Sequence, residues 1–389
     1  MNRNLLFIRL YYLFWLGAGG FIYPFISLFY KQQGLSGTQM GLLGTVASVI
    51  GLVSAPLIGR ISDKVSNPRR VLQVCLIGSS VLFLVLSQQK TFLWIAVIIA
   101  FESMIGAPIY PLSDAQALNV ANHQKEGYGS IRLWGSLGWA ITAFVGGWIV
   151  ERTGLVSVFI GYAISYGLCA LMLVALTTPR SLTPKTDEPH LPLKEVLQNL
   201  LSDRALIGLA FAFAIFWLTS NGRQQFEALY MQQLGASERM IGLAYTYPAL
   251  IEIPIMLWAD KLMRKYGAGK LLTLALLIES LVMSIIVISP SLISILFMRL
   301  ASSLYYSFYA VASIAYASER APTGQRATVL SLYFVTLGST ISLVASPITG
   351  MIFDRVGAYP LYIIAMVGAF AAWLILVFTQ NKTSMPLQK

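Results

Sequence analysis

Apolar residues run along this chain in long blocks separated by short polar connections. A helix that crosses a bilayer needs about 20 mainly apolar residues, and twelve blocks reach that length. They cover approximately residues 5–30, 38–59, 71–88, 92–116, 129–150, 154–176, 204–233, 238–260, 270–288, 291–317, 326–351 and 358–379. The pattern predicts an all-α membrane protein with twelve transmembrane helices.

The longest polar segment, residues 177–203, is rich in proline and charge. It lies near the midpoint of the chain and leaves six apolar blocks on each side. We therefore predict an N-terminal six-helix bundle over 1–176, a cytoplasmic linker over 177–203 and a C-terminal six-helix bundle over 204–389. The first block is too long for a signal-peptide core and no small-residue cleavage site follows it, so we interpret it as a retained span.

Three short motifs of the first half return in the second half at an offset of about 200 residues. The pairs are GLSGTQMG (34–41) with GASERMIG (235–242), ISDKV (61–65) with WADKL (258–262), and IVERTG (149–154) with IFDRVG (352–357). Matches in the same order at nearly one offset indicate a parallel duplication of six spans. Such a duplication is found in transporters with two pseudo-symmetric halves.

The composition agrees with a membrane environment. Of the 389 residues, 57% are hydrophobic and 11% are charged, whereas soluble proteins have about 25% charged residues. With a cytoplasmic N-terminus, 19 of the 27 Lys and Arg residues fall on that side, five on the opposite side and three within or at the edge of spans. This bias predicts a multi-pass protein of the cell (inner) membrane with both termini cytoplasmic. It also explains the net charge of +11 without nucleic-acid binding.

Motifs of catalysis and metal binding do not occur in the sequence. HExxH, GxSxG and GxxxxGK(S/T) are absent, so we predict neither an enzyme nor an ATP-driven pump. Cys75 and Cys169 lie inside apolar blocks without metal-ligand spacing, and we expect no metal and no cofactor. The sequence does not favour a membrane enzyme or lipid-handling protein, which would show acidic or histidine clusters at a membrane face. It does not favour a sensor built on a transporter fold either, because such a sensor would carry an extra signalling domain.

The connection between the second and third blocks, GRISDKVSNPRR (59–70), resembles the signature loop of the major facilitator superfamily. The residues that carry the resemblance are Gly59, Asp63, Lys64, Arg69 and Arg70. The resemblance implies two pseudo-symmetric six-helix bundles, and a charged latch in this loop that holds one gate shut. The alternative is a plain basic cytoplasmic loop.

Within that superfamily, YPLSDAQAL (110–118) followed by YGSIRLWGSLGWA (128–140) resembles the lactose permease and phenylpropionate permease group. Asp114 and Arg132 stand 18 positions apart, like the sugar-binding acid and arginine of that group, and Trp139 matches its sugar-stacking tryptophan. RQQFEALY (223–230) and Glu252 keep its spacing in the seventh and eighth spans. The resemblance implies these substrate-binding residues: Asp114, Arg132, Ser136, Trp139, Tyr23, Gln225 and Glu252.

The residue types fit that role. Arg132, Ser136 and Trp139 recur at i, i+4 and i+7 and therefore form one stripe of a helix. A guanidinium fork beside a flat indole suits a hydroxylated ring, or a carboxylate attached to an aromatic ring. Asp114 can pair with Arg132 in the empty site. The alternative is a structural ion pair that only joins two helices.

The predicted spans hold more acids than bases: Glu102, Asp114, Glu227, Glu252 and Glu279 against Arg132, Arg223 and Arg299. An acid without a basic partner is favoured in its neutral form away from water, so it can bind and release a proton. We name Glu227, Glu252, Glu279 and Glu102 as candidates for proton coupling, and a fixed ion pair or a neutral hydrogen-bonded acid as the alternative for each.

The local sequence suggests a pairing partner for Glu227 and a position beside a cavity for Glu252. Arg223 and Glu227 are at i, i+4 and can pair along one helix face, and Arg299 is a further charge-pairing candidate. Glu252 lies between two prolines, Pro248 and Pro254, where a broken helix can frame a cavity.

The sequence departs from the lactose permease group in its ninth and tenth spans. Met283, Ser302 and Tyr305 occupy the positions of that group's helix 9 arginine and its helix 10 histidine and acid. The group's coupling residues are therefore absent here in that form.

We predict a secondary transporter that works by alternating access and couples uptake of a sugar or glycoside to a proton. Uptake of an aromatic acid or nucleoside, and proton-driven drug efflux, are the alternatives. The expected partners are the lipid bilayer, a small-molecule substrate and protons. The fold can work as a monomer.

Overall fold

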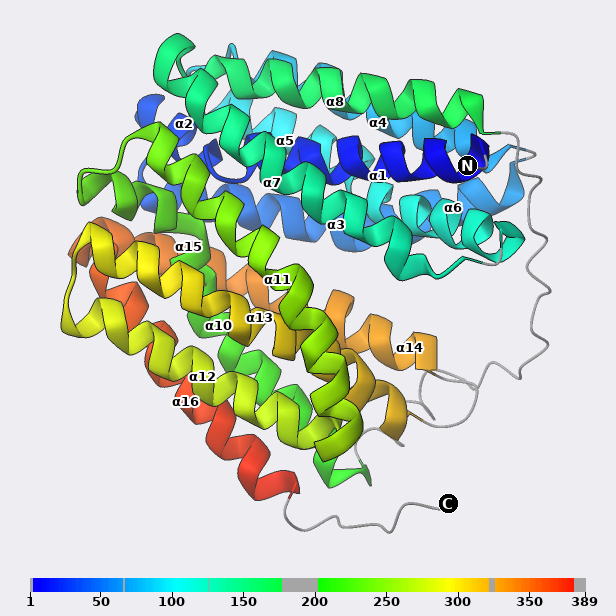
Figure 1. The fold of residues 1–389 in the computed structure, drawn as a ribbon. Helices are drawn as coiled ribbons and strands as arrows, with labels where there is room; N and C mark the ends of the chain where they lie inside the picture. The colour runs from blue at the N-terminus through cyan, green and yellow to red at the C-terminus, as the bar shows by residue number, and fades with distance from the viewer. Residues whose placement is uncertain (1–2, 66, 125, 177–201, 322–325, 381–389) are drawn as a thin grey trace. The chain divides into compact units, whose positions relative to one another are not determined.

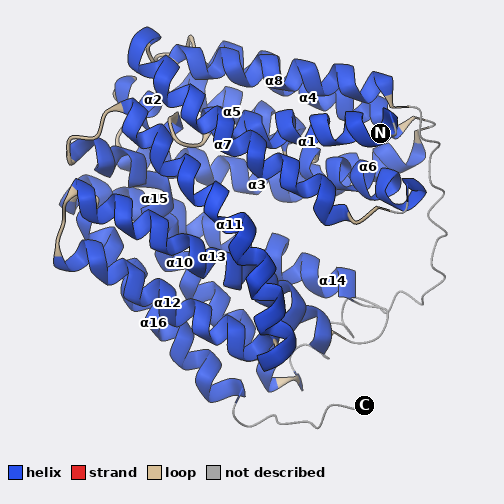
Figure 2. Cartoon of the chain, viewed as in Figure 1, coloured by secondary structure: helices blue, strands red, loops and turns tan. Residues whose placement is uncertain are grey.

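The computed structural model describes residues 3–65, 67–124, 126–176, 202–321 and 326–380. These residues form helices and short connections, and none of them belongs to a strand (Figure 2). The predicted all-α class is confirmed.

Helices before residue 177 are α1 (Arg3–Ile22), α2 (Ile26–Gln32), α3 (Gly37–Lys64), α4 (Pro68–Leu86), α5 (Phe92–Gly106), α6 (Ile109–Gln124), α7 (Tyr128–Thr153) and α8 (Val156–Ala175). Helices after residue 201 are α10 (Arg204–Gln233), α11 (Glu238–Tyr266), α12 (Ala268–Ile288), α13 (Leu292–Arg320), α14 (Arg326–Leu330), the π-helical turn η1 (Ser331–Leu337), α15 (Gly338–Val356) and α16 (Tyr359–Gln380).

These elements make twelve segments long and apolar enough to cross a membrane within the described residues. Six precede residue 177 and six follow residue 201, which confirms the twelve predicted spans. Two predicted spans are divided: Pro24 lies between α1 and α2, and Pro108 between α5 and α6. Proline lacks the N–H that continues a helix, so the chain bends at both places.

The described chain has two compact units. The first contains the residues up to 176 together with 228–250, and the second contains 202–227 and the residues from 251 onward. The first part of α11 is thus in the first unit. The predicted linker 177–203 lies almost wholly outside the described residues, so the predicted domain boundaries stay a prediction.

Helix α1 is the central element of the first unit, and it packs against α7 and α8 (Figure 1). Glycines make the crossing with α7 close: a Cβ on Gly138 would lie 2.7 Å from the carbonyl carbon of Leu13. Thr142 then donates a hydrogen bond from Oγ1 to the carbonyl of Gly17, at 2.6 Å. Close backbone approach through small residues, with a hydroxyl bond across it, is typical of helix packing in membranes.

The second unit has its own apolar core, in which α12 packs against α13 and α16. Phe213 and Phe216 of α10 are fully buried in it and contact Tyr309 of α13, with ring centroids 5.6 Å apart in both pairs. Trp217 donates from its indole nitrogen to the hydroxyl of Tyr309, at 2.9 Å. The buried tyrosine therefore has its polar end satisfied.

We predict that Gly138→Ala lowers the free energy of unfolding by about 1–3 kcal/mol, because the added methyl group overpacks the α1–α7 crossing. The check is a thermal denaturation curve of the purified protein in detergent. Gly129→Ala, in the same helix but with open space around its Cβ, is the matched control and should be neutral or slightly stabilising. Equal stability of both variants would contradict the close crossing.

Candidate functional site

Helix α7 presents two different stripes. Gly135 and Gly138 are buried against α1, whereas Arg132, Ser136 and Trp139 are half-buried. The glycines thus serve packing, and the predicted binding residues occupy the remaining surface of the same turns.

Trp139 lies against α1 at Gly19. A Cβ on Gly19 would be 2.7 Å from Cζ3 of the indole, so the absence of a side chain there makes room for the ring. Tyr23, the first residue after α1, packs against Trp139 with ring centroids 5.7 Å apart. Tyr23 is 46% exposed and also contacts Tyr245, which belongs to the same unit, at 6.0 Å.

Asp114, on α6, accepts two short hydrogen bonds at Oδ1. The hydroxyl of Tyr12 on α1 donates at 2.6 Å, and the hydroxyl of Tyr128 on α7 donates at 2.8 Å. Tyr128 also has an electrostatic interaction with Arg132, one turn along α7. Tyr128 therefore interacts with both Asp114 and Arg132, while the direct pairing of these two residues stays a prediction.

Aromatic rings surround this carboxylate. Trp15 contacts Tyr12 and Tyr110 edge-on, with ring centroids 5.1 Å apart in each pair. Tyr12 also contacts Tyr128 at 6.3 Å. The result is a carboxylate and several phenols set in flat apolar walls, which is the combination that binds hydroxyl groups and one face of a ring.

The sequence reasoning missed the roles of Tyr12 and Tyr128. The sequence pattern assigned no role to either residue. One sequence feature does point to Tyr128: it is four residues before Arg132 and so shares its helix face. Tyr12 is 102 positions from Asp114, and nothing local links the two.

In the second unit, four charged side chains form one network. Arg223 pairs with Glu227 at 2.9 Å and with Glu279 of α12 at 3.2 Å. Arg299 of α13 pairs with the other oxygen of Glu227. The structure thus contains the i, i+4 pair expected within α10, and adds Glu279 and Arg299 to it. We call these four residues the charge quartet.

The charge quartet is neutral and buried. The side chains of Glu227 and Glu279 are 1% exposed, and those of Arg223 and Arg299 are 9% and 15% exposed. Removing one partner of such a network leaves an uncompensated charge in a medium of low dielectric constant. Both arginines are therefore engaged by carboxylates of the protein itself.

The remaining predicted residues are more scattered. Glu252 is half-buried in α11 and its carbonyl oxygen accepts from Ser307, at 3.4 Å; α11 is continuous through the flanking prolines. The side-chain oxygen Oε1 of Gln225 is buried without a hydrogen-bond partner among the described residues. Glu102 is in α5 and accepts from Ser79 of α4 at 2.9 Å. Glu102 forms no ion pair with the described side chains.

The predicted latch loop joins α3 to α4. Arg69 donates from Nε to Gln116 at 3.2 Å and from a terminal nitrogen to the carbonyl of Leu176 at 2.5 Å. It thus ties α4 to α6 and to the end of α8 within the first unit. Lys64 and Arg70 are exposed, and Gly59 has open space around it. The side chain of Asp63 lies outside the described residues, and the latch role stays a prediction.

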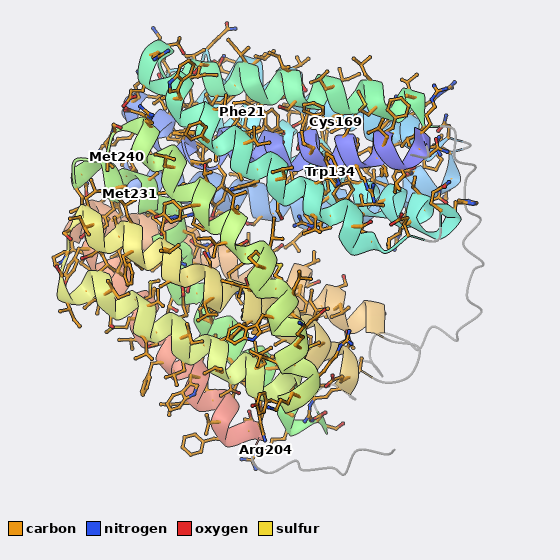
Figure 3. The ribbon with its side chains drawn as sticks, viewed as in Figure 1. Phe21, Trp134, Cys169, Arg204, Met231 and Met240 are labelled. Carbon is orange, nitrogen blue, oxygen red and sulfur yellow. The ribbon has the colours of Figure 1, made fainter. Side chains whose placement is uncertain are left out.

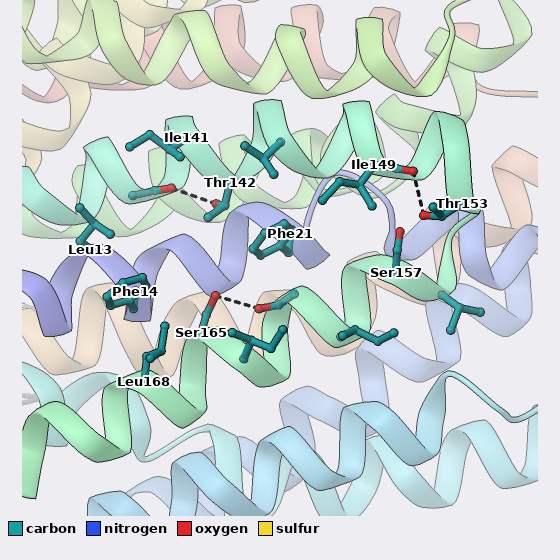
Figure 4. Close-up of a pocket in the computed structure, with 16 residues that line it drawn as sticks. Leu13, Phe14, Phe21, Ile141, Thr142, Ile149, Thr153, Ser157, Ser165 and Leu168 are labelled. Atoms are coloured by element: carbon teal, nitrogen blue, oxygen red, sulfur yellow. Dashed lines mark hydrogen bonds between the residues drawn. The ribbon is translucent and has the colours of Figure 1, made fainter.

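A cavity of about 640 Å³ lies between α1, α7 and α8 (Figure 4). Its walls are mostly apolar, and its hydroxyls donate to backbone carbonyls, as Thr153 does to Ile149 and Ser165 to Gly161. Nearby, Cys169 of α8 is directed toward α1, with Sγ 3.5 Å from the carbonyl oxygen of Tyr11 (Figure 3). This cavity lacks the polar groups that would hold a sugar.

No group of three or more His, Cys, Asp or Glu side chains within the described ranges could hold a metal ion.

Comparison with known proteins gives consistent matches over nearly the whole chain. The sequence model of the MFS_1 like family matches residues 5–364. Maltose permease of Geobacillus stearothermophilus is 25% identical over 387 residues, 98% of this chain and 96% of that protein. The probable 3-phenylpropionic acid transporter of Escherichia coli (strain K12) is 22% identical over 67% of this chain and 70% of that protein. The crystal structure of nucleoside transporter NupG has a TM-score of 0.77 at 12% identity, covering 99% of this chain and 100% of that chain.

We predict that Glu279→Gln and Arg299→Gln each lower the free energy of unfolding by about 3–5 kcal/mol, because each leaves the buried network with one uncompensated charge. The double variant keeps the Arg223–Glu227 pair and a neutral network, so it should be more stable than either single variant. Thermal denaturation of the four proteins in detergent measures this. Additive losses in the double variant would show that charge balance does not govern the charge quartet.

Proposed function

Because this chain belongs to the MFS_1 like family and is a multi-pass membrane transporter of the major facilitator type, we propose that it couples uptake of a sugar or glycoside to a proton. Alternating access of a central site, without an enzymatic step, is the mechanism. The observation that carries the proposal is the Asp114 site, where a carboxylate, two phenols and the indole of Trp15 are gathered in one unit.

The chemistry of that site supports a neutral, hydroxylated ligand. Asp114 holds two O–H donors, and a sugar hydroxyl can replace either of them without changing the charge. Trp139 offers a flat face, since Gly19 leaves it room against α1. A carboxylate and an aromatic face together are a common means of binding polyhydroxylated rings.

The charge quartet argues against an anionic ligand. An aromatic acid needs a cation for its carboxylate, and because Arg223 and Arg299 are already paired with Glu227 and Glu279, Arg132 would have to supply it. Displacing one of these carboxylates would leave it buried and unpaired, which is costly. The partnerless Oε1 of Gln225, by contrast, suits a neutral hydroxyl donor.

The relatives also favour a sugar over an aromatic acid as the substrate. Maltose permease matches over almost the full length of both chains, whereas the probable 3-phenylpropionic acid transporter matches over about two thirds. Uptake of an aromatic acid or a nucleoside is the second candidate. Proton-driven drug efflux is less supported, because the Asp114 site is built from polar groups rather than from apolar walls alone.

The remaining proposals concern placement and partners. We place the protein in the cell (inner) membrane with both termini cytoplasmic, because Lys and Arg are concentrated in the connections on that side. It works as a monomer, with lipid, protons and the small-molecule substrate as its partners.

We predict that Arg132→Ala raises the KM for the transported sugar about 10- to 100-fold, since a hydrogen bond to a charged group contributes about 1.5–3 kcal/mol. The measurement is substrate-driven proton uptake into proteoliposomes, with maltose, lactose, uridine and 3-phenylpropionate as the panel. Arg152→Ala, an exposed arginine at the end of the same helix, is the control and should behave as wild type.

The outcomes of the substrate panel distinguish the candidate functions. Proton uptake with maltose or lactose supports the proposal, and uptake only with uridine or 3-phenylpropionate replaces the sugar by the second candidate. A transported sugar that moves no protons contradicts symport. Unchanged kinetics in the Arg132 variant would reduce Arg132 to a structural residue.

We further predict that Gly19→Val displaces the Trp139 indole and weakens sugar binding, because the new side chain would occupy the place of the ring. Quenching of tryptophan fluorescence by the sugar measures binding. Gly127→Val is the control, because Gly127 has open space around its Cβ position and no positive φ. Gly34 also has open space around it, but its positive φ of 78° would strain a valine there. Equal affinity in both variants would exclude Trp139 from the binding site.

A further inference from the structure

Glu102 has a different setting from the acids of the charge quartet. It is half-buried in α5, ten positions after the start of that helix at Phe92. Its oxygen Oε1 accepts from Oγ of Ser79, which is fully buried in α4. Gly106, one turn further, leaves room for the carboxyl group: a Cβ there would lie 3.1 Å from Cδ of Glu102.

The groups around Glu102 are neutral. On α4, Ser79 is one turn from the buried thiol of Cys75. On α8, the phenols of Tyr162 and Tyr166 interact electrostatically with Glu102, as does Tyr30 of α2. Phenols and thiols are uncharged near neutral pH in their ordinary state.

The other helices that pack against α5 bring no cation to Glu102 within the described part of the chain. Helix α3 contributes Ser54, which donates to the carbonyl of Ser103 at 3.3 Å. Its charged residues, Arg60, Asp63 and Lys64, are in its last two turns. Helix α6 contributes Asp114, engaged by tyrosines, and His123 in its last turn.

An ionised carboxylate in a membrane interior is costly unless a cation or several donors compensate it. Glu102 has one neutral donor, Ser79. Binding a proton removes the charge and the cost together. From this setting we propose that Glu102 binds the coupled proton, an assignment that rests on the proposed symport and names its proton site.

The charge quartet is less suited to that role. Protonating Glu227 or Glu279 would leave the buried network with two arginines and one carboxylate, so one positive charge would be uncompensated. Protonating Glu102 leaves no orphaned cation. The charge quartet therefore works as a fixed structural network, and Glu102 as the group that changes charge.

A chain of side chains connects Glu102 to the Asp114 site within the first unit. Ser79 Oγ is 2.9 Å from the hydroxyl of Tyr162, and the ring of Tyr162 lies 4.3 Å from that of Tyr166. Tyr166 interacts in turn with the indole of Trp15. Trp15 packs against Tyr12, which donates to Asp114.

Each hydroxyl in this chain has one hydrogen and can donate or accept. When Glu102 is ionised, Ser79 donates to it and accepts from Tyr162. When Glu102 carries a proton, its O–H can donate to Ser79, whose own hydrogen then turns toward Tyr162. The protonation state of Glu102 thus reorders the hydrogen bonds of Ser79 and Tyr162, and ring packing of Trp15 against Tyr12 completes the connection to Asp114.

Infrared spectroscopy tests the proton site without a substrate. The purified protein in lipid is titrated with acid while the C=O band of protonated carboxyl groups is recorded. We expect one titrating band that is missing in Glu102→Gln and present in Glu151→Gln, an exposed acid at the end of α7. Ser79→Ala removes the donor and should shift this band without abolishing it. Identical spectra for wild type and Glu102→Gln would overturn the assignment.

Transport measurements test the coupling, with maltose as the probe in proteoliposomes. We expect Glu102→Gln to lose at least about tenfold in maltose-driven proton uptake, a barrier change of about 1.4 kcal/mol or more, while Glu151→Gln keeps the wild-type rate. Exchange of labelled maltose at equal concentrations should persist in Glu102→Gln, which a misfolded protein would not allow.

The two hypotheses fail in different ways. If wild type moves protons with maltose and Glu102→Gln does so equally well, Glu102 is not the proton site and the symport stands. If wild type moves no proton with any compound of the panel, the symport is wrong and Glu102 has no coupling role.

Discussion

The cost of a charge in the membrane interior governs how this protein is built. An ionised side chain persists there only where other groups replace the water that it has lost. The second unit meets this requirement with ion pairs, in which two arginines and two glutamates neutralise one another. The first unit meets it with hydroxyl groups, which reach Asp114 from two tyrosines and Glu102 from one serine.

The backbone architecture could be predicted from the sequence because the bilayer imposes one length and one polarity on every span. The local breaks were harder to predict. Pro24 and Pro108 interrupt helices, whereas Pro248 and Pro254, between which a broken helix was expected, lie in the continuous helix α11. Proline is tolerated in a membrane helix where neighbouring groups satisfy the freed backbone atoms, and those neighbours are set by the tertiary structure.

The candidate site could be predicted only where its residues share a helix. Arg132, Ser136 and Trp139, and the pair of Arg223 with Glu227, follow from helical spacing. Glu279 joins Arg223 across 56 positions and Tyr12 joins Asp114 across 102. No periodicity encodes such contacts. They depend on how closely helices approach, and for α1 and α7 that approach depends on glycines whose role is visible only in three dimensions.

The two ways of compensating charge have different consequences for a transport cycle. In the charge quartet, adding or removing a proton breaks an ion pair and leaves a buried charge, so the network favours a single charge state. Around Glu102 and Asp114, the neighbours are hydroxyls that can reverse donor and acceptor without losing a bond. A change of protonation is therefore cheaper in the first unit. Because the same unit holds the Asp114 site, the proposed binding of substrate and of the proton would both take place in the first unit, with no need to separate an arginine from its acid.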